Sequence, residues 1–369
     1  MKFILLLTVA GAVFSAVAQN TPMTLKEAFK NDFLIGAALN QSQFEYQAPR
    51  EDQIILAQFN CISPENALKW ESVHPEPGQF DFSDADRYVA FGEKHHMFIV
   101  GHNLIWHNQT PAWVFQDAQG NPISRKALIA RMRKHIFTVV GRYKGKIGGW
   151  DVVNEALNED GTLRDSPWRR IIGDDYLKLA YQFAHEADPN AQLYYNDYSL
   201  ENMAKQRGAI ALIKNLQAQG VRIDAIGLQE HDTMDWPSTN QVDETISAFA
   251  RLGIKVMITE LDIDLLPRAT RSHSAEVSMN VAAGERLNPY VNGLPEALEQ
   301  KLARRYADLF SVFVAHRRQI SRVTFWGVTD GDSWLNNWPV PGRMSYPLLF
   351  DRNCHPKPAF AAVIHTATH

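Results

Sequence analysis

Short runs of apolar, β-branched and aromatic residues recur along the chain, and most of them end in polar residues. Runs of this kind are typical of β-strands that are buried on both faces. We interpret eight of them as strands: residues 33–39, 60–66, 97–106, 148–157, 192–197, 224–231, 255–263 and 322–330. Segments with apolar residues at helical spacing lie between several of these runs, namely residues 123–143, 176–187, 201–220 and 295–318.

The alternation of strands with helices predicts an α/β protein with a parallel sheet. Eight strand and helix units in one chain favour a single closed (β/α)8 TIM barrel. The alternative is an open doubly wound sheet, which should carry a glycine-rich phosphate loop after its first strand. Residues 36–40 occupy that place, read GAALN and lack the fingerprint. We therefore predict the barrel.

Two segments outside these units add to the predicted domain. Residues 24–27 have the pattern of a capping box, which predicts a short helix that closes the bottom of the barrel. Residues 265–294 follow the seventh strand as a long insertion with scattered Pro, Ser, Asn and Gly, and loops of that length are usually functional or mobile. We expect this insertion to form a rim of the substrate cleft. No linker separates a second module, so residues 19–369 are expected to form one domain.

The amino terminus predicts export. Lys2 precedes an apolar stretch, and residues 16–18 supply small side chains for cleavage near Ala18, which is typical of a removable signal peptide over residues 1–18. No later run has the roughly 18 consecutive apolar residues that a membrane span requires. We expect a soluble, monomeric protein that is secreted or periplasmic.

Composition limits the partners. The chain has 37 Lys and Arg against 41 Asp and Glu, a formal net charge of −4, so it offers no basic excess to nucleic acid. Its two cysteines, Cys61 and Cys354, are too few for a disulfide framework, and we expect buried free thiols. The 9 Trp residues matter more, because several are close in sequence to carboxylates and amides, where sugar rings could stack on them.

Polar residues gather where the predicted strands end, which is where a barrel carries its active groups. Glu155 and Glu260 end the fourth and seventh strands, each after residues that should be buried. Such a carboxyl pair is what cleavage of a glycosidic bond needs. One group must be protonated and the other ionised, and burial beside a second carboxylate raises the pKa of one of them.

Two further features of the strand ends are assigned no chemistry. Glu230 fits a solvent-side rim position about as well as a site position. His102 and His107 lie close together, but no third ligand follows at a recognised metal spacing such as HExxH. We therefore expect no catalytic metal and no cofactor.

Seven motifs together resemble family 10 of the glycoside hydrolases, the barrel xylanases. They occur in that family's order over about residues 24–363, and they are ENALKW (65–70), GHNLIWHNQTPAW (101–113), WDVVNEAL (150–157), YNDY (195–198), Gln229 with His231, ITELDI (258–263) and WGVTDGDSW (326–334). The resemblance implies an endo-acting enzyme that cuts β-1,4-xylan and xylo-oligosaccharides with retention of anomeric configuration.

The same resemblance implies a role for each matching residue. Glu155 would be the acid/base, Glu260 the nucleophile and Asn154 a partner of the sugar 2-hydroxyl, while His231 with Asp262 behind it would orient Glu260. The residues that would contact substrate are Lys69, His102 and Gln229 at the reacting sugar, Glu65, Asn66 and Gln109 at the next sugar, and Trp326 and Trp334 along the cleft. Trp106 is a further candidate, although packing is its more ordinary role, as it is for Trp70 and Trp150.

Crowding by Trp334 and Gln109, where a glucose would carry its exocyclic CH2OH, would favour xylan over cellulose. Two alternatives stay open from the sequence. One is a related barrel glycosidase that acts on glucan or mannan. The other is a carbohydrate-binding protein without catalysis, because fold alone does not give function.

Overall fold

The computed structural model describes residues 23–267, 275–282 and 284–367, so the predicted signal peptide and part of the 265–294 insertion lie outside the described residues. The helices and strands are α1 Leu25–Ala28, β1 Leu34–Leu39, α2 Gln41–Phe44, α3 Pro49–Gln58, β2 Cys61–Pro64, α4 Trp70–Val73, α5 Ser83–Lys94, β3 Phe98–Ile105, η1 Ala112–Val114, α6 Arg125–Arg142, β4 Gly149–Asn154, α7 Pro167–Ile172, α8 Tyr176–Ala187, β5 Gln192–Asp197, α9 Met203–Ala218, β6 Ala225–Leu228, β7 His231–Thr233, α10 Thr239–Ala250, β8 Lys255–Asp264, η2 Glu285–Leu287, α11 Glu296–Ala315, β9 Ile320–Phe325, η3 Trp334–Asn336 and α12 Pro358–Thr366.

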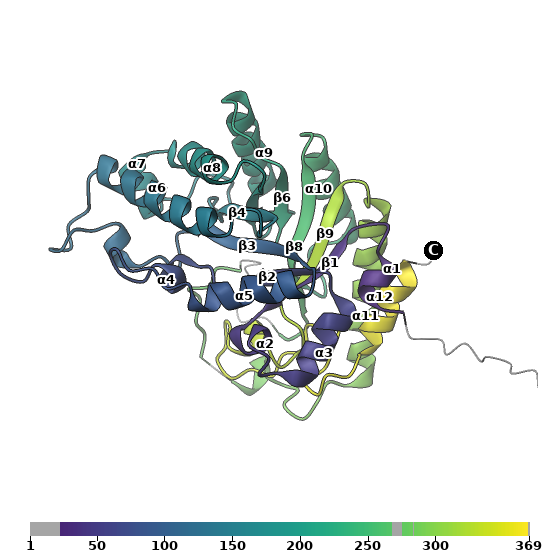
Figure 1. Cartoon of the computed structure of the whole chain (residues 1–369). Helices are drawn as coiled ribbons and strands as arrows, with labels where there is room; N and C mark the ends of the chain where they lie inside the picture. Colours follow the sequence, from purple (N-terminus) through teal and green to yellow (C-terminus); the bar gives the residue numbers. More distant parts are fainter. Residues whose placement is uncertain (1–22, 268–274, 283, 368–369) are drawn as a thin grey trace, which may run out of the picture.

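Eight parallel strands close into a barrel that the helices surround (Figure 1). β1 pairs with β2 on one side and with β9 on the other, and β6 pairs with β8, which completes the ring. The remaining strand, β7, continues β6 for three residues after a break and also pairs with β8. The (β/α)8 TIM barrel predicted from the alternation of strands and helices is confirmed.

The strands are buried along most of their length because helices cover the outside of the barrel. In β8, for example, every residue from Val256 to Ile263 is buried. The interior includes Tyr194 and Met257 together with a buried Arg322, whose guanidinium lies 5.5 Å from the centre of the Tyr194 ring. The apolar runs of the sequence therefore correspond to the strands of the barrel, as predicted for strands that are buried on both faces.

The short helix expected after Thr24 is present as α1, but the predicted capping box is wrong. The Thr24 side chain makes no capping hydrogen bond, and its Oγ1 finds no partner among the described residues. A different N–H of the first turn has a side-chain acceptor, since the Leu25 N–H donates to Gln58 Oε1 at 2.9 Å. Glu27 forms an exposed ion pair with Lys30 at 3.5 Å. The first turn of α1 is therefore held by a side chain distant in sequence and not by a local capping box.

Three strand ends differ from the sequence prediction. β4 ends at Asn154 because Glu155 has φ 55°, and β6 ends at Leu228 shortly before Glu230, which also has φ 55°. A left-handed residue turns the chain out of the extended ladder. The last strand, β9, ends at Phe325, so residues 326–330 lie beyond it. The breaks at Glu155 and Glu230 both fall on the face of the barrel where chemistry is expected.

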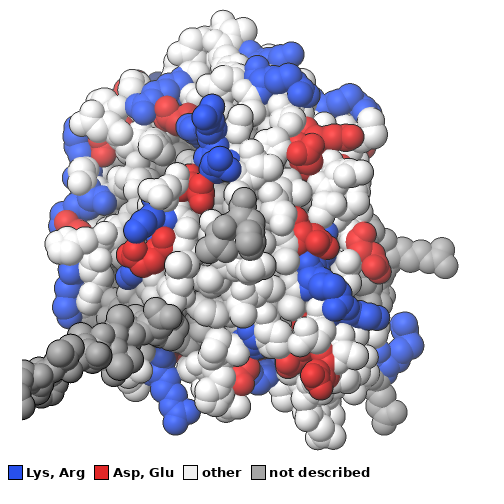
Figure 2. All heavy atoms as spheres, turned by 90° about the vertical axis from the view of Figure 1, so that its right-hand side faces the viewer, with Lys and Arg blue, Asp and Glu red and all other residues white. Residues whose placement is uncertain are grey.

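The cysteines and surface charges complete the description of the fold. Cys61 and Cys354 are both free thiols, but only Cys61 is buried and Cys354 is half-buried, which corrects the expectation of two buried thiols. On the face shown in Figure 2, basic and acidic side chains are interspersed and form no patch of one sign. Within the described ranges, no helix is both long and apolar enough to cross a membrane.

Candidate active site

Glu155 and Glu260 face the same cavity, about 160 Å³ in volume. Glu155 follows β4 directly, and Glu260 lies within β8, where the pairing with β9 shifts register. The other residues that line the cavity are Glu65, Lys69, His102, Trp106, Gln109, Asn154, Gln229, His231, Ala275, Val277, Trp326 and Trp334. The barrel therefore brings together two carboxyl groups that lie on separate strands, as the sequence pattern predicts.

Three side-chain donors hold the Glu155 carboxyl group. Trp106 Nε1 donates to Oε2 at 2.9 Å, while Gln229 Nε2 and Asn154 Nδ2 donate to Oε1 at 3.1 Å and 3.2 Å. Only 4% of the Glu155 side chain is exposed. Trp106 thus lines the cavity and also orients Glu155, so its role is more than packing.

The pKa of Glu155 is raised above its ordinary value. Burial is the largest cause, because it penalises the charged carboxylate, and the negative charge of Asp197 adds to the effect. The charge of His107 and the hydrogen bonds from Gln229 and Trp106 oppose the increase without cancelling it. Glu155 is therefore suited to retain a proton and donate it.

The Glu260 carboxylate is held by two donors and a chain of hydrogen bonds behind one of them. Asn196 Nδ2 donates to Oε1 at 2.7 Å, and His231 Nε2 lies 3.1 Å from Oε2. Behind the imidazole, His231 Nδ1 lies 3.1 Å from Asp262 Oδ1, and Trp334 Nε1 donates to Asp262 Oδ2 at 2.7 Å. This is the geometry expected of a side chain that fixes the orientation of a nucleophile.

The pKa of Glu260 is lowered although the group is buried. Burial alone would raise it, but the hydrogen bond from His231 and the charges of His102 and His231 together outweigh burial. Burial likewise acts to lower the pKa of His231, yet the charges of Asp262 and Glu260 and hydrogen bonds to them raise it to about 10. At neutral pH His231 is therefore an imidazolium, and the pKa values of Glu155 and Glu260 are shifted in opposite directions.

Two amide side chains connect the carboxyl groups. Asn154, which donates to Glu155, accepts at Oδ1 a hydrogen bond of 2.9 Å from Asn196, and Asn196 also donates to Glu260. Thr259 Oγ1 donates to Asn196 Oδ1 at 2.6 Å and fixes the orientation of that amide. Sequence reasoning gave Asn196 no role, although it lies in the YNDY motif at the end of the fifth strand, a position that indicated an active-site neighbour.

On one side of the cavity, Lys69 is buried among carboxylates and amides. Its Nζ donates to Asn66 Oδ1 at 2.9 Å and to Gln109 Oε1 at 2.6 Å, and it lies 5.1 Å from the Trp106 ring centre. Burial lowers the pKa of Lys69, and nearby carboxylates, first that of Glu65, oppose the shift. The structure therefore gathers the predicted substrate-binding residues on this side into one polar group.

Aromatic side chains form another part of the wall. Trp326 and Trp334 both line the cavity, and the rings of His102 and Trp326 form a T-shaped contact at a centroid distance of 5.4 Å. Asp151 orients His102, since its Oδ2 lies 2.9 Å from His102 Nδ1. Trp338 stacks on Trp334 at 4.3 Å, a support that the sequence did not indicate. Packing and substrate contact are thus compatible roles for Trp334.

The described part of the 265–294 insertion reaches the cavity. Ala275 and Val277 line it, and Glu276 between them accepts hydrogen bonds from Arg164 at 3.0 Å and Asn108 at 3.1 Å. These contacts attach the segment to the loops that follow β4 and β3. Neither side chain at 275 and 277 was a predicted site residue.

From the sequence, Glu230 could lie either on the solvent-exposed rim or in the active site, and the structure places its side chain in neither. Its side chain is only 2% exposed, so it does not lie on the rim, and it is not among the residues that line the cavity.

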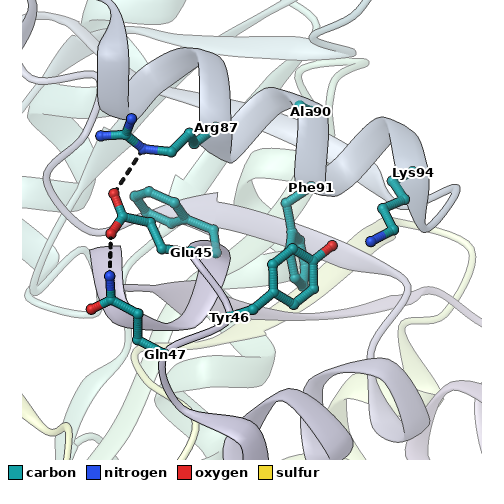
Figure 3. A pocket seen from close by; sticks show the side chains of 8 residues that line it. Glu45, Tyr46, Gln47, Arg87, Ala90, Phe91 and Lys94 are labelled. Atoms are coloured by element: carbon teal, nitrogen blue, oxygen red, sulfur yellow. Dashed lines mark hydrogen bonds and ion pairs between the residues drawn. The ribbon is translucent and has the colours of Figure 1, made fainter.

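A larger hollow of about 550 Å³ lies on the outside of the barrel, between α5 and the segment around α2 (Figure 3). Its carboxyl group, Glu45, is engaged by Arg87 at 2.7 Å and by Gln47 at 2.8 Å. The residues that line it are Phe44, Glu45, Tyr46, Gln47, Arg87, Ala90, Phe91 and Lys94. Because it offers no second carboxyl group, we assign glycosidic chemistry to the smaller cavity.

Comparison with known proteins agrees with this assignment. The model of "Glycosyl hydrolase family 10" matches residues 24–366. An endo-1,4-beta-xylanase A from Xylanibacter ruminicola is 47% identical over 350 residues, which cover 95% of each chain. A beta-1,4-xylanase from Dictyoglomus thermophilum is 39% identical over 92% of this chain and 90% of its own. A GH10 endoxylanase retrieved from a sugarcane soil metagenome superposes with a TM-score of 0.90 at 46% identity, covering 92% of this chain and 99% of its own.

Proposed function

The chain belongs to glycosyl hydrolase family 10, and from this premise we propose that it is an endo-β-1,4-xylanase that hydrolyses internal bonds of xylan with retention of configuration. The observation that carries the proposal is the pair Glu155 and Glu260, which line one cavity and have pKa values shifted in opposite directions. A raised pKa suits a general acid, and a lowered pKa suits a nucleophile. The names of its relatives support xylan as the substrate.

In the first step, a Glu260 carboxylate oxygen attacks the anomeric carbon while Glu155 transfers its proton to the glycosidic oxygen. The bond from the anomeric carbon to the leaving sugar breaks, and a covalent glycosyl-enzyme ester forms at Glu260. The Glu155 carboxylate that remains is stabilised by three hydrogen bonds, because Trp106, Gln229 and Asn154 already donate to its oxygens. The leaving chain departs as an alcohol.

In the second step, Glu155 acts as a base. It removes a proton from water, the water oxygen attacks the anomeric carbon, and the ester bond to Glu260 breaks. Two inversions at one carbon give net retention. His231 and Asn196 stabilise the departing Glu260 carboxylate through the same hydrogen bonds that hold it in the free enzyme.

The remaining polar residues are proposed to bind sugar hydroxyls. Asn154 would contact the 2-hydroxyl of the reacting sugar, a contact that strengthens in the transition state. Lys69, His102 and Gln229 would hold the other hydroxyls there, and all three line the cavity. The proposed contacts of the next sugar on the non-reducing side are Glu65, Asn66 and Gln109.

Preference for xylose over glucose is proposed to arise from Trp334 and Gln109. Both line the cavity, which is only about 160 Å³ in volume. An exocyclic CH2OH group adds volume that such a space cannot accept without displacing a side chain. Trp334 is a rigid wall because it stacks on Trp338 and donates to Asp262.

The cellular location and assembly are further parts of the proposal. We propose that cleavage near Ala18 releases residues 19–369 as one domain that acts as a secreted or periplasmic monomer. The composition of residues 1–18 supports export.

Incubation of the protein with linear xylan tests the function. We expect fragments of several lengths from the start, and NMR of the first products should detect the β-anomer. The α-anomer first would contradict retention, and release of only the shortest sugar would contradict endo action. Faster cleavage of carboxymethylcellulose or mannan than of xylan would instead support the related glycosidase, and xylan binding without new reducing ends would support a carbohydrate-binding protein.

A further inference from the structure

One short segment contacts both proposed catalytic carboxyl groups. Gln229 Nε2 donates to Glu155 Oε1 at 3.1 Å, and two residues later His231 Nε2 lies 3.1 Å from Glu260 Oε2. Glu230 stands between them with φ 55°, in the left-handed region that few glutamates adopt. The left-handed turn at Glu230 therefore lies between two residues that contact the proposed catalytic carboxyl groups.

The Glu230 side chain is directed into a buried group of carboxyls rather than into the cavity. It lies close to Glu201, which precedes α9, and to Asp232 in β7. The exposed fractions of Glu201, Glu230 and Asp232 are 4%, 2% and 2%. Neither Glu230 oxygen accepts a hydrogen bond from an N–H or hydroxyl group of the described residues.

Among the described residues, two cations, Arg305 and Lys205, face these three carboxyls, which is one too few to neutralise them all. Arg305 from α11 binds Asp232 Oδ2 at 3.1 Å. Lys205 from α9 faces Glu201, but its charge is shared with another carboxylate, because its Nζ lies 2.9 Å from Asp197 Oδ1. Asp262 from β8 adds a further negative charge near Asp232.

Two ionised carboxylates cannot hydrogen-bond to each other, because each is only an acceptor, whereas a protonated carboxyl supplies the missing donor. Burial is the largest cause that raises the pKa of Glu230, and the negative charge of Asp232 raises it further. Burial also raises the pKa of Glu201 and of Asp232. Retention of protons therefore agrees with the contacts between the side chains.

We propose that Glu230, as a neutral carboxylic acid hydrogen-bonded to Glu201 and Asp232, is a positioning residue that holds Gln229 on Glu155 and His231 on Glu260. This inference rests on the catalytic roles proposed above for Glu155 and Glu260. The three carboxyls do not form a cation site, since the described residues contain no group of His, Cys, Asp or Glu arranged to hold a metal ion.

A consequence follows for alkaline solution. When the shared protons are lost, the buried carboxylates repel one another, and the two cations beside them, Arg305 and Lys205, do not balance three negative charges. The segment from Gln229 to His231 then leaves its place, and kcat falls more steeply with pH than deprotonation of Glu155 alone would cause. In a variant without a titratable group at position 230, kcat should therefore decrease less steeply with rising pH than in the wild type.

Three variants test the role. Glu230→Ala removes the hydrogen bonds and is expected to lower kcat about 10-fold or more with KM changed less than about 3-fold, because misplaced groups weaken the transition state most. Glu230→Gln keeps a donor and an acceptor and should stay within about 3-fold of the wild type, with a shallower alkaline limb. Glu244→Ala, which removes an exposed carboxyl from α10, is the control.

A direct measurement keeps the inference testable if Glu230→Ala does not fold. Infrared difference spectra of wild type minus Glu230→Gln at neutral pH should contain the C=O stretch of a protonated carboxyl group. Absence of that band would overturn the inference, as would a Glu230→Gln variant that loses as much kcat as Glu230→Ala. So would a Glu230→Ala variant with the wild-type kcat and pH profile. Because the infrared band needs no substrate, it distinguishes failure of this inference from failure of the proposed xylanase activity.

Discussion

The His231 imidazole lies between two carboxylates, with Nε2 3.1 Å from Glu260 Oε2 and Nδ1 3.1 Å from Asp262 Oδ1. With its pKa raised to about 10, the ring donates through both nitrogens at neutral pH. Its hydrogen bond is the largest of the causes that lower the pKa of the buried Glu260, and its positive charge adds to the charge of His102 and to the hydrogen bond from Asn196. The properties of the proposed nucleophile therefore depend on a residue that does not react.

His231→Gln is expected to move the acidic limb of the pH profile. Glu260 must be ionised to attack, and loss of the imidazolium raises the pKa of Glu260, so activity should be lost at a higher pH as the solution is acidified. We expect a shift of about 1 pH unit and a fall in kcat of about 10-fold. The pH dependence of kcat/KM on xylan measures the shift of the acidic limb. An unshifted acidic limb would contradict the dependence, and His185→Gln on the surface of α8 serves as the control.

Glu155→Gln is expected to lower kcat on unactivated xylan by about 10²–10⁴-fold, because the leaving oxygen no longer receives a proton. An aryl xylobioside with an acidic phenol needs little protonation, so its first step should persist and the glycosyl-enzyme should accumulate as a burst of phenol. Stopped-flow absorbance detects the burst. Full turnover of xylan by this variant would remove Glu155 from its role. Glu186→Gln, which breaks an exposed ion pair with Arg133, should leave kcat unchanged.

Trp334→Ala is expected to relax sugar selectivity. Removing the indole opens the space for a CH2OH group, so the ratio of kcat/KM for aryl cellobioside to that for aryl xylobioside should rise about 10-fold. The xylobioside rate itself should fall, because Asp262 loses its hydrogen bond of 2.7 Å from Trp334. Trp338→Ala, which removes a support outside the cavity lining, should change the ratio less. Equal changes in both variants would count against a direct role for Trp334.

Glu276→Gln is expected to loosen the segment that carries Ala275 and Val277. The carboxylate pairs with Arg164 at 3.0 Å, and the hydrogen bond from His107 is the largest cause that lowers its pKa. We expect KM for xylohexaose to rise about 3-fold to 10-fold and kcat on an aryl xylobioside to change less than about 2-fold. Glu296→Gln, an exposed carboxylate at the start of α11, is the matched control. An unchanged KM for long and short substrates would argue that this segment does not meet substrate.

The barrel itself could be predicted because its signal is local and repeated. Each strand contains a short run of buried residues, as in β5 from Leu193 to Asp197, and each is followed by a helix with its own apolar spacing. The predicted positions of Glu155 and Glu260 required only that parallel strands end on one face. The contact of Gln58 with the first N–H of α1 could not be predicted in this way, because it depends on how α1 and α3 pack.

The sequence by itself determined the closed barrel and which polar residues stand at its strand ends, because hydrophobic periodicity is a property of neighbours along the chain. Only the tertiary structure decided which protonation state each carboxyl favours. Glu155, Glu230 and Glu260 are all buried glutamates of the barrel, yet of the three only Glu260 has a lowered pKa, because hydrogen bonds from His231 and Asn196 and the charges of His102 and His231 outweigh burial. Burial and charge act through space, so groups that are distant in sequence set these differences.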